Sequence, residues 1–422
     1  MRDDELTALV SAFLYFFFAL ASWFVLRPMR DTVAAAIGSV ALSVLWIGTL
    51  GTMLVANAIF SAVVVRFPPR KFIPYAYHAI TVSLVLFYFA FRKFGAVEGS
   101  NSDLMMEKAF YVWTSVFNLF VTSLFWCFMA DTFRSEQAKR LFGFIGVGGT
   151  LGSIAGSAAT ASLAKVLGSA NLLLVSCVLL QIAVLVVMRF PRTDATAGAA
   201  GPSEATKALG GSVWDGLTHI VKSPYLTGVA AFLALFTIGS SFLYFEQSAI
   251  VGAVYADRAS RTEVLAQIEL AVQVATVLAQ VFLTGRLIRW FGLGAALAFL
   301  PVVSMIGFGA IAAAPTFAAV AAFVVLRRAG NFAFTNPAME ILFTVVPRED
   351  KYKAKAFIET FVYRGGDQLG AWAFAGLTTL GLGLTAIAWI AVPMSAVWMA
   401  LAVWLARRQA AMAAVSERTA PT

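Results

Sequence analysis

The sequence predicts an all-α polytopic membrane protein with twelve transmembrane helices in two six-helix halves. The chain is 60% hydrophobic and 13% charged, with a mean hydropathy of +0.83, whereas soluble proteins are about half apolar and about a quarter charged. Its 422 residues accommodate roughly 10 to 14 spans of about 20 residues each, which excludes a large soluble domain. Apolar stretches between polar breaks occupy residues 7–36, 41–65, 72–91, 109–130, 141–164, 170–189, 225–250, 263–285, 292–313, 316–346, 356–380 and 384–406.

The first and tenth apolar stretches are longer than a bilayer requires. Each contains a proline, Pro28 and Pro337. Proline removes a helical hydrogen bond, and long spans must tilt or bend, so we expect a tilt, a kink or a break in both helices.

The basic residues predict the orientation of the chain in the membrane. With twelve spans, twenty Lys and Arg residues fall on the side that holds both termini, six fall on the opposite side, and five lie inside the apolar stretches. Because Lys and Arg accumulate in cytoplasmic loops, we expect a multi-pass protein of the cell (inner) membrane with both termini in the cytoplasm. The net charge of +9 then requires no nucleic-acid partner.

A polar segment divides the chain in the middle. Residues 193–212 are rich in Ala, Gly, Thr and Ser, which predicts a flexible linker, and 213–222 could form an interfacial helix. The expected parts are an N-terminal half (1–189), a cytoplasmic linker (190–224), a C-terminal half (225–406) and a cytoplasmic tail (407–422).

An internal repeat accompanies this division. A basic loop followed by Gly148, Gly149 and Gly152 has a counterpart about half a chain later, where a basic loop precedes Gly365, Gly366 and Gly370. Two six-helix repeats joined by a cytoplasmic linker are the layout of major-facilitator transporters, in which the solute binds near the midplane between the halves.

The candidate binding residues are ionisable groups inside the apolar stretches, where each costs roughly 2.5–3.5 kcal/mol unless it is paired, hydrated or functional. Arg327 and Arg328 fall near the bilayer centre, with Asn331 and Glu340 on the same stretch. Adjacent helical positions point about 100° apart, so at most one of the two arginines can face a narrow cavity. Ion pairing of both and solute binding by at least one remain open.

A second group lies in the first stretch. Arg27 and Asp31 are four positions apart and can neutralise each other, which would leave Arg30 for a solute anion. A guanidinium presents a planar fork of donors that fits carboxylate and phosphate oxygens. The alternative is an arginine that reaches the membrane interface.

Two glutamates lack a basic residue three or four positions away. Glu246 and Glu269 must therefore pair with Arg27 or Arg30, contact the solute, or act as proton-coupling groups, because a buried unpaired carboxylate favours its protonated form. In the eleventh stretch, Arg364 and Asp367 are three positions apart and can form an internal ion pair.

The remaining residue patterns predict neither an enzyme nor a cofactor site. Two cysteines inside apolar runs and two histidines give no metal-ligand set. The glycines of 146–152 lack the Lys-Ser/Thr ending of a phosphate-binding loop. Instead, Gly148, Gly152 and Gly156 recur every four residues, which predicts close helix packing.

The chain resembles the ATP/ADP translocases of intracellular bacteria and plastids and their bacterial relatives. The resemblance is carried by Leu-Arg-Pro-Met-Arg-Asp-Thr at 26–32, Tyr-Phe-Glu at 244–246, elements of 280–292, Arg327-Arg328, Met339-Glu340 and Lys353-Ala-Lys355. It implies twelve helices with a major-facilitator-like fold and exchange of nucleoside di- and triphosphates. It also implies site positions at Arg30, Asp31 and Glu246, of which the first is usually Lys in the family.

One position departs from that family. The basic residue that commonly follows the span-seven acid by four positions is Ile250 here. We expect an anionic small-molecule solute bound by Arg30 and by Arg327 or Arg328, with the bilayer as the other partner and no required oligomer. Nucleotide exchange, proton-coupled movement of another organic anion or amphiphile, and a lipid-handling or partner-binding protein remain open.

Overall fold

The computed structural model describes residues 3–66, 69–95, 99–133, 135–191, 218, 220–346, 354–355 and 357–419. Within these residues the regular structure is helical throughout. The longer elements are α1 (Asp3–Ile37), α2 (Ser39–Arg66), α3 (Pro69–Phe94), α4 (Asn101–Thr132), α5 (Ser135–Leu167), α6 (Ser169–Met188), α8 (Pro224–Val254), α9 (Arg258–Phe282), α10 (Thr284–Ala313), α11 (Phe317–Gly330), α14 (Tyr363–Thr379) and α15 (Leu384–Thr419).

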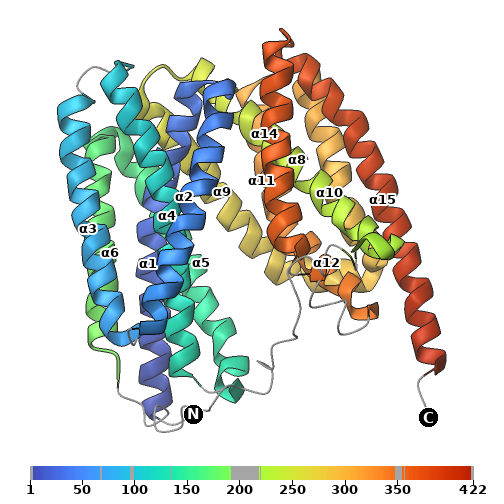
Figure 1. The fold of residues 1–422 in the computed structure, drawn as a ribbon, viewed down its shortest axis with the longest axis horizontal. Coiled ribbons are helices and arrows are strands. Elements are labelled where there is room, and N and C mark those ends of the chain that lie inside the picture. Colours follow the sequence, from blue (N-terminus) through green and yellow to red (C-terminus); the bar gives the residue numbers. More distant parts are fainter. Residues whose placement is uncertain are drawn as a thin grey trace. The chain divides into compact units, whose positions relative to one another are not determined.

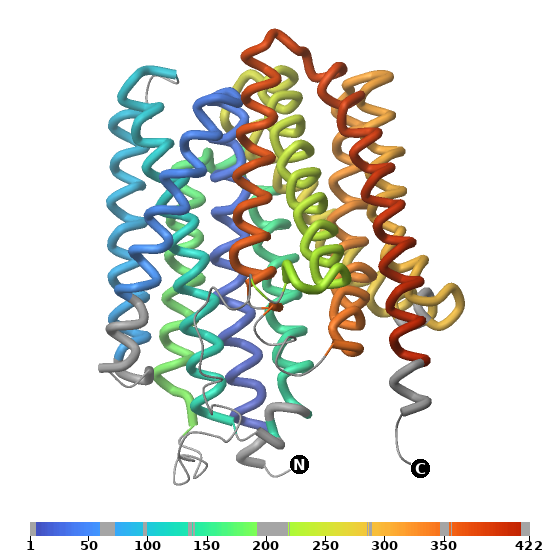
Figure 2. The backbone as a smooth tube through the Cα atoms, turned by 45° about the vertical axis from the view of Figure 1, so that its right-hand side comes forward, coloured from blue at the N-terminus to red at the C-terminus, as the bar shows by residue number. Residues whose placement is uncertain are grey.

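These helices confirm the predicted all-α membrane fold. Each of the twelve apolar stretches corresponds to a helical element, and among the described residues eleven helices are long and apolar enough to cross a membrane. The remaining stretch is divided into a π-helical turn, η5 (Ile358–Val362), and the 17-residue α14. Figure 2 shows α14 joined to α15 by the short turn at 380–383.

The expected interruption of the tenth stretch is confirmed. The α-helix α11 gives way to the π-helix η3 (Asn331–Thr335), the short helix α12 (Asn336–Leu342) and the 3-10 turn η4 (Phe343–Val345). Pro337 lies in the first turn of α12, directly after the π-helix η3, so the residue without a backbone N–H follows the point at which regular α-helical bonding is interrupted. In contrast, α1 runs through Pro28 without a break.

Contacts divide the chain into two compact units. Unit 1 comprises Met1–Ile37, Val44–Ala205 and Tyr255–Gln273, and unit 2 comprises Gly38–Ser43, Thr206–Val254 and Val274–Thr422. The helix α9 therefore contributes to both units. The domain bounds drawn from the sequence stay a prediction, and most of the linker 190–224 lies outside the described residues. Of the predicted interfacial helix 213–222, residues 218 and 220–222 are described, and they are helical.

The centre of unit 1 is α1, which packs against α4, α5 and α6 (Figure 1). The predicted close packing of the glycine stripe is confirmed, since a Cβ added at Gly148, Gly152 or Gly156 of α5 would lie less than 3.0 Å from a carbonyl oxygen of α1. Only glycine allows the two backbones to approach this closely.

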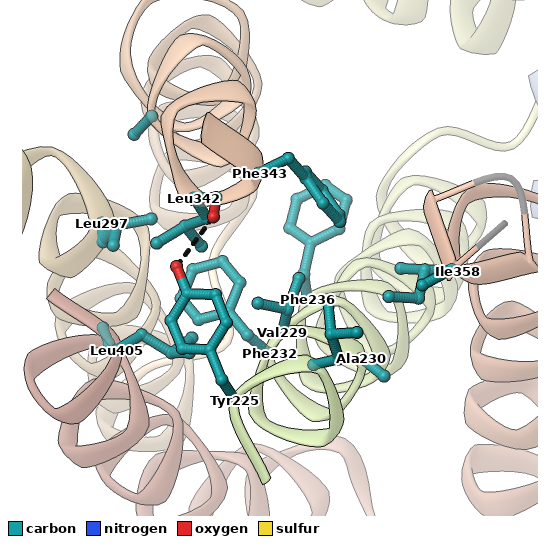
Figure 3. Close-up of a cluster of buried hydrophobic side chains, with 14 of the residues drawn as sticks. Tyr225, Val229, Ala230, Phe232, Phe236, Leu297, Leu342, Phe343, Ile358 and Leu405 are labelled. Carbon is teal, nitrogen blue, oxygen red and sulfur yellow. Dashed lines mark hydrogen bonds between the residues drawn. The ribbon is translucent and has the colours of Figure 1, made fainter. Parts of the chain in front are cut away.

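Unit 2 is built around α8, which packs against α11, α14 and α15. A hydrophobic cluster surrounds the amino-terminal end of α8, which the sequence predicts to be cytoplasmic. There the buried Tyr225 hydroxyl donates a hydrogen bond of 2.8 Å to the carbonyl of Leu342 (Figure 3). Gly366 and Gly370 of α14 pack directly against α8. The repeated glycines therefore bring together α1 with α5 in unit 1 and α8 with α14 in unit 2.

Candidate functional site

The first candidate group lies in unit 1 and begins at Arg27 of α1. Its Nη1 lies 3.1 Å from Oε1 of Glu269 in α9, and the two side chains are 25% and 4% exposed. Of the alternatives left open for Glu269, the structure shows the pairing with a span-one arginine. Because burial penalises an isolated charge, each member of the pair stabilises the other in its charged form.

The neighbouring Arg30 is held by an aromatic group. Its Nη2 donates a hydrogen bond of 3.0 Å to the hydroxyl of Tyr111, and its guanidinium lies 4.2 Å from the centroid of that ring. Trp46 donates to the same hydroxyl at 2.9 Å. Asp31 Oδ1 lies 3.7 Å from Arg30 Nη1. The sequence led us to expect an Arg30 without protein partners, and the structure shows that it has them, although its side chain remains 22% exposed.

Neutral polar residues extend this group from α9 toward α5. The amide of Gln273 donates to Glu269 Oε1 at 2.8 Å, and the hydroxyl of Ser153 donates to Gln273 Oε1 at 3.2 Å. Sequence reasoning missed these two residues, together with Tyr111 and Trp46. The available signal was the presence of hydrogen-bonding groups within otherwise apolar helices.

The second candidate group lies in unit 2 around Arg327 of α11, which is only 3% exposed. Its Nε, Nη1 and Nη2 donate to Ser304 Oγ at 3.1 Å, Ser240 Oγ at 2.7 Å and the carbonyl of Phe236 at 2.8 Å. The guanidinium also lies 5.9 Å from the Trp398 ring. All three nitrogens are thus bonded to neutral oxygens of α8 and α10, which joins these helices to α11.

The other arginines of unit 2 have different surroundings. Arg328 is half-buried, in keeping with the expected divergence of adjacent helical positions. Arg364 at the start of α14 is exposed, and it forms no ion pair within 4.0 Å with Asp367, although both residues are described. The expected internal pair is therefore wrong. The carbonyl of Asp367 instead accepts a hydrogen bond of 3.0 Å from Ser241 of α8.

Glu340 and Asn331 lie in different helical elements of the interrupted tenth stretch. Asn331 opens η3, whereas Glu340 is in α12, and its exposed carboxylate accepts hydrogen bonds of 2.8 and 2.7 Å from Lys355. Lys355 also lies 3.6 Å from Glu359. Burial acts to lower the pKa of Lys355, but the hydrogen bond to Glu340 and the nearby carboxylates outweigh it and raise that pKa. This group is a salt-bridge cluster separate from Arg327.

Glu246 of α8 has the most unusual environment of the candidates. It is fully buried, and neither carboxyl oxygen has a hydrogen-bond partner among the described residues. The two proton-coupling candidates therefore differ, since Glu269 is paired with an arginine whereas Glu246 has no such partner within the described part of the chain.

Comparisons with known proteins agree with this architecture. No family model matches the chain. The ADP,ATP carrier protein 2 of Chlamydia pneumoniae is 26% identical over 221 residues, which are 46% of this chain and 41% of that carrier. The matched region thus spans less than half of the carrier's length.

Solved structures match the chain almost from end to end. The nucleoside transporter NupG is 16% identical, with 97% of this chain and 100% of that one covered and a TM-score of 0.61. A bacterial homologue of the human lysosomal transporter Spinster, in an inward-facing, unoccupied conformation, is 13% identical, with 99% and 98% covered and a TM-score of 0.53. The chain is a multi-pass membrane protein with a major-facilitator-type transporter fold.

Proposed function

We propose that the chain is a secondary transporter that moves an anionic solute by alternating access, with nucleotide exchange of the ATP/ADP type as the leading substrate class. The observation that carries the proposal is Arg30, a permanently charged group in a transmembrane helix that is oriented by Tyr111 and remains 22% exposed. A guanidinium that is already fixed against an aromatic ring loses little further conformational freedom when it binds a phosphate or carboxylate.

Other charged residues take different parts in this proposal. Arg27 and Asp31 flank Arg30 on α1 and set the charge that an anion meets. In unit 2, the partly exposed Arg328 and the exposed Arg364 are the candidates for solute contact. Arg327 is assigned a structural role, because all its nitrogens already donate to protein oxygens.

The nucleotide assignment is supported by the partial match to the Chlamydia pneumoniae carrier and by the resemblance of the 26–32 motif. Ile250 weighs against it, since this position offers no cation for a polyphosphate. The positive-inside distribution further supports an inner-membrane location with both termini in the cytoplasm.

A ligand panel tests the proposal. The purified protein should gain thermal stability with its solute, because ligand binding to the folded state shifts unfolding, and we expect a selective gain with ATP or ADP over adenosine, phosphate and unrelated organic anions. Counterflow of labelled ADP in proteoliposomes should follow. Stability that is unchanged by every nucleotide would contradict nucleotide exchange.

A matched arginine provides the control. Arg30→Ala should abolish the ligand-dependent gain, whereas Arg92→Ala should retain it. Arg92 of α3 also donates to a tyrosine hydroxyl, that of Tyr88 at 3.2 Å, and lies 6.0 Å from that ring, but it is exposed at the end of its helix. The pair of variants therefore removes the same chemistry at two places. Equal loss in both would contradict the assignment of Arg30.

A second candidate function is proton-coupled transport of another organic anion or amphiphile. The full burial of Glu246, with no hydrogen-bond partner in the described ranges of the chain, favours it, because an ionised carboxylate in that position would be unstable. Uptake driven by an imposed proton gradient, without solute inside the vesicles, would distinguish this function from exchange.

A further inference from the structure

We propose that the amino-terminal segment of α9, Tyr255–Gln273, is a detachable latch that closes one side of the transport path. The sequence places this segment in the C-terminal six-helix half, yet its contacts assign it to unit 1. Alternating access requires the two repeats to move against each other. A C-terminal-half segment that packs with N-terminal-half helices must therefore separate from them once in each cycle.

The first end of the latch is a cluster of buried charges. Nη2 of Arg258 lies 2.6 Å from Asp103 Oδ2 and 2.9 Å from Glu107 Oε1, both on α4. The acidic side chains are 0% and 4% exposed. Both carboxylates are charge-compensated by a residue from another part of the sequence, so release of Arg258 removes a cation that two buried acids share.

The other end of the latch reaches the candidate site. Thr262 Oγ1 lies 2.9 Å from Thr32 Oγ1 of α1, Glu269 pairs with Arg27, and Gln273 bonds to Ser153 of α5. The α9 positions 258, 262, 269 and 273 are separated by four, seven and four residues, which places them on one face of the helix. One continuous polar face of α9 thus contacts α1, α4 and α5.

The chemistry of this seam suits reversible contact. Its polar contacts are ion pairs and hydrogen bonds, which water can replace when the segment leaves. The segment also buries apolar side chains such as Leu265 and Val272, and Arg258 lies 5.5 Å from the centroid of the Phe91 ring. The α1–α5 contact is different, because its glycines leave so little space that an added Cβ would lie less than 3.0 Å from a carbonyl oxygen of α1, and separation would leave matched surfaces with no substitute partner. We therefore infer that α9 separates from its neighbours during transport, whereas α1 and α5 stay packed together.

The pair Arg27–Glu269 connects the latch to solute binding, and this step rests on the proposed function. An anion that binds at Arg27 and Arg30 competes with the carboxylate of Glu269 for the same guanidinium donors. Occupancy of the site thus weakens the inner end of the latch, which would make return of the empty carrier slow and favour exchange.

A reversible crosslink tests the movement. In a background with Cys127→Ala and Cys177→Ala, the pair Thr32→Cys and Thr262→Cys should form a disulfide, since the native hydroxyl oxygens are 2.9 Å apart. We expect oxidation to reduce solute counterflow at least tenfold and reductant to restore it. An oxidised protein, verified by mass spectrometry, that transports at the reduced rate would overturn the latch.

The matched control joins two helices of the same half. Ser22 of α1 and Ser176 of α6 have hydroxyl oxygens 2.8 Å apart and are buried. The pair Ser22→Cys and Ser176→Cys, in the same background, should oxidise without loss of counterflow. Equal inhibition in both crosslinked proteins would show that any crosslink to α1 stops transport and would overturn the latch as well.

A labelling experiment tests the latch without any transported solute. Thr262 is 0% exposed, so a single Thr262→Cys should react slowly with a membrane-impermeant maleimide in the background without native cysteines. Added Arg258→Ala, or Asp103→Asn together with Glu107→Gln, should speed labelling at least tenfold, whereas added Arg92→Ala should not. The second, charge-neutralising pair preserves side-chain shape if Arg258→Ala impairs folding.

The outcomes separate the latch from the proposed function. Faster labelling in the charge variants supports the latch even if no nucleotide binds. Unchanged labelling in folded charge variants overturns the latch even if nucleotide exchange is demonstrated. If ADP is exchanged but accelerates labelling no more than adenosine does, release by solute competition is overturned.

Discussion

Arg27 in α1 forms an ion pair of 3.1 Å with Glu269 in α9, although 242 positions separate the two residues. The contact brings together a solute-binding candidate and a residue first considered for proton coupling. The Glu269 carboxylate also accepts a hydrogen bond from the side-chain amide of Gln273. Glu269 therefore has a structural partner in this conformation, which separates its role from that of Glu246.

Loss of Glu269 should destabilise the protein measurably. Glu269→Gln leaves the Arg27 charge without this carboxylate, and we expect a loss of about 2 kcal/mol in the free energy of unfolding. Removal of one member of a fully buried pair costs roughly 3–5 kcal/mol, and the 25% exposure of Arg27 reduces that cost. Denaturation in mixed micelles measures it.

The pair of Lys165 with Glu263 provides the comparison on the same segment. Its ammonium and carboxylate are 2.6 Å apart, but the Lys165 side chain is 59% exposed, and solvent screens such pairs. Glu263→Gln should leave stability unchanged within error. A loss of stability as large as that of Glu269→Gln would contradict the argument that burial decides how much each ion pair contributes.

Arg327 should be required for folding of unit 2 rather than for solute affinity. Arg327→Lys replaces three donor nitrogens with one, whose N–H groups cannot reach all three oxygens placed around the guanidinium. We therefore expect about 3 kcal/mol or more of destabilisation, or loss of the monodisperse protein in size-exclusion chromatography. Arg328→Ala should fold and lower anion affinity. The opposite pattern would exchange the roles assigned to these neighbours.

Packing at the α1–α5 crossing should tolerate no side chain. Gly152→Ala places a methyl group against the α1 backbone at Phe17, and overpacking of this kind costs about 1–3 kcal/mol. Gly143→Ala in the same helix meets nothing within 4 Å and should be neutral or stabilising, since alanine favours the helix. Melting temperatures of the two variants provide the test.

The sequence predicted the helices better than the bonds between them. Twelve apolar stretches, the interruption near Pro337 and the glycine stripe follow from local patterns of length, polarity and spacing. The partners of Arg327 do not, because Ser240 and Phe236 are 87 and 91 positions away. Whether a buried arginine meets a carboxylate, a hydroxyl or a carbonyl depends on helix packing, which local spacing does not report.

Acidic pH should weaken the start of the α9 latch. The backbone N–H of Ser260 donates to Asp257 Oδ1 at 2.8 Å, and this bond lowers the pKa of Asp257. The stabilisation is therefore complete above the ordinary aspartate pKa and is lost as pH falls through the lowered, folded-state value. Capping bonds of this type contribute about 1 kcal/mol.

Asp257→Asn is the matched variant, because an amide oxygen can also cap the helix but does not titrate in this range. We expect hydrogen exchange in the first turn of α9, corrected for intrinsic rates, to increase below about pH 4 in the original protein only. An identical pH profile in the two proteins would assign the change to other groups.

Replacement of Glu246 should distinguish proton coupling from exchange. Glu246→Gln is nearly isosteric and cannot carry a transferable proton, and the native carboxyl has no hydrogen bond to lose among the described residues. If Glu246 couples transport to protons, uptake driven by a proton gradient should fall at least tenfold while counterflow persists. Because counterflow needs no net proton movement, its survival also serves as the folding control. A variant that retains gradient-driven uptake would exclude Glu246 as the coupling group, and one that loses both activities with an unchanged melting temperature would assign it to the solute site.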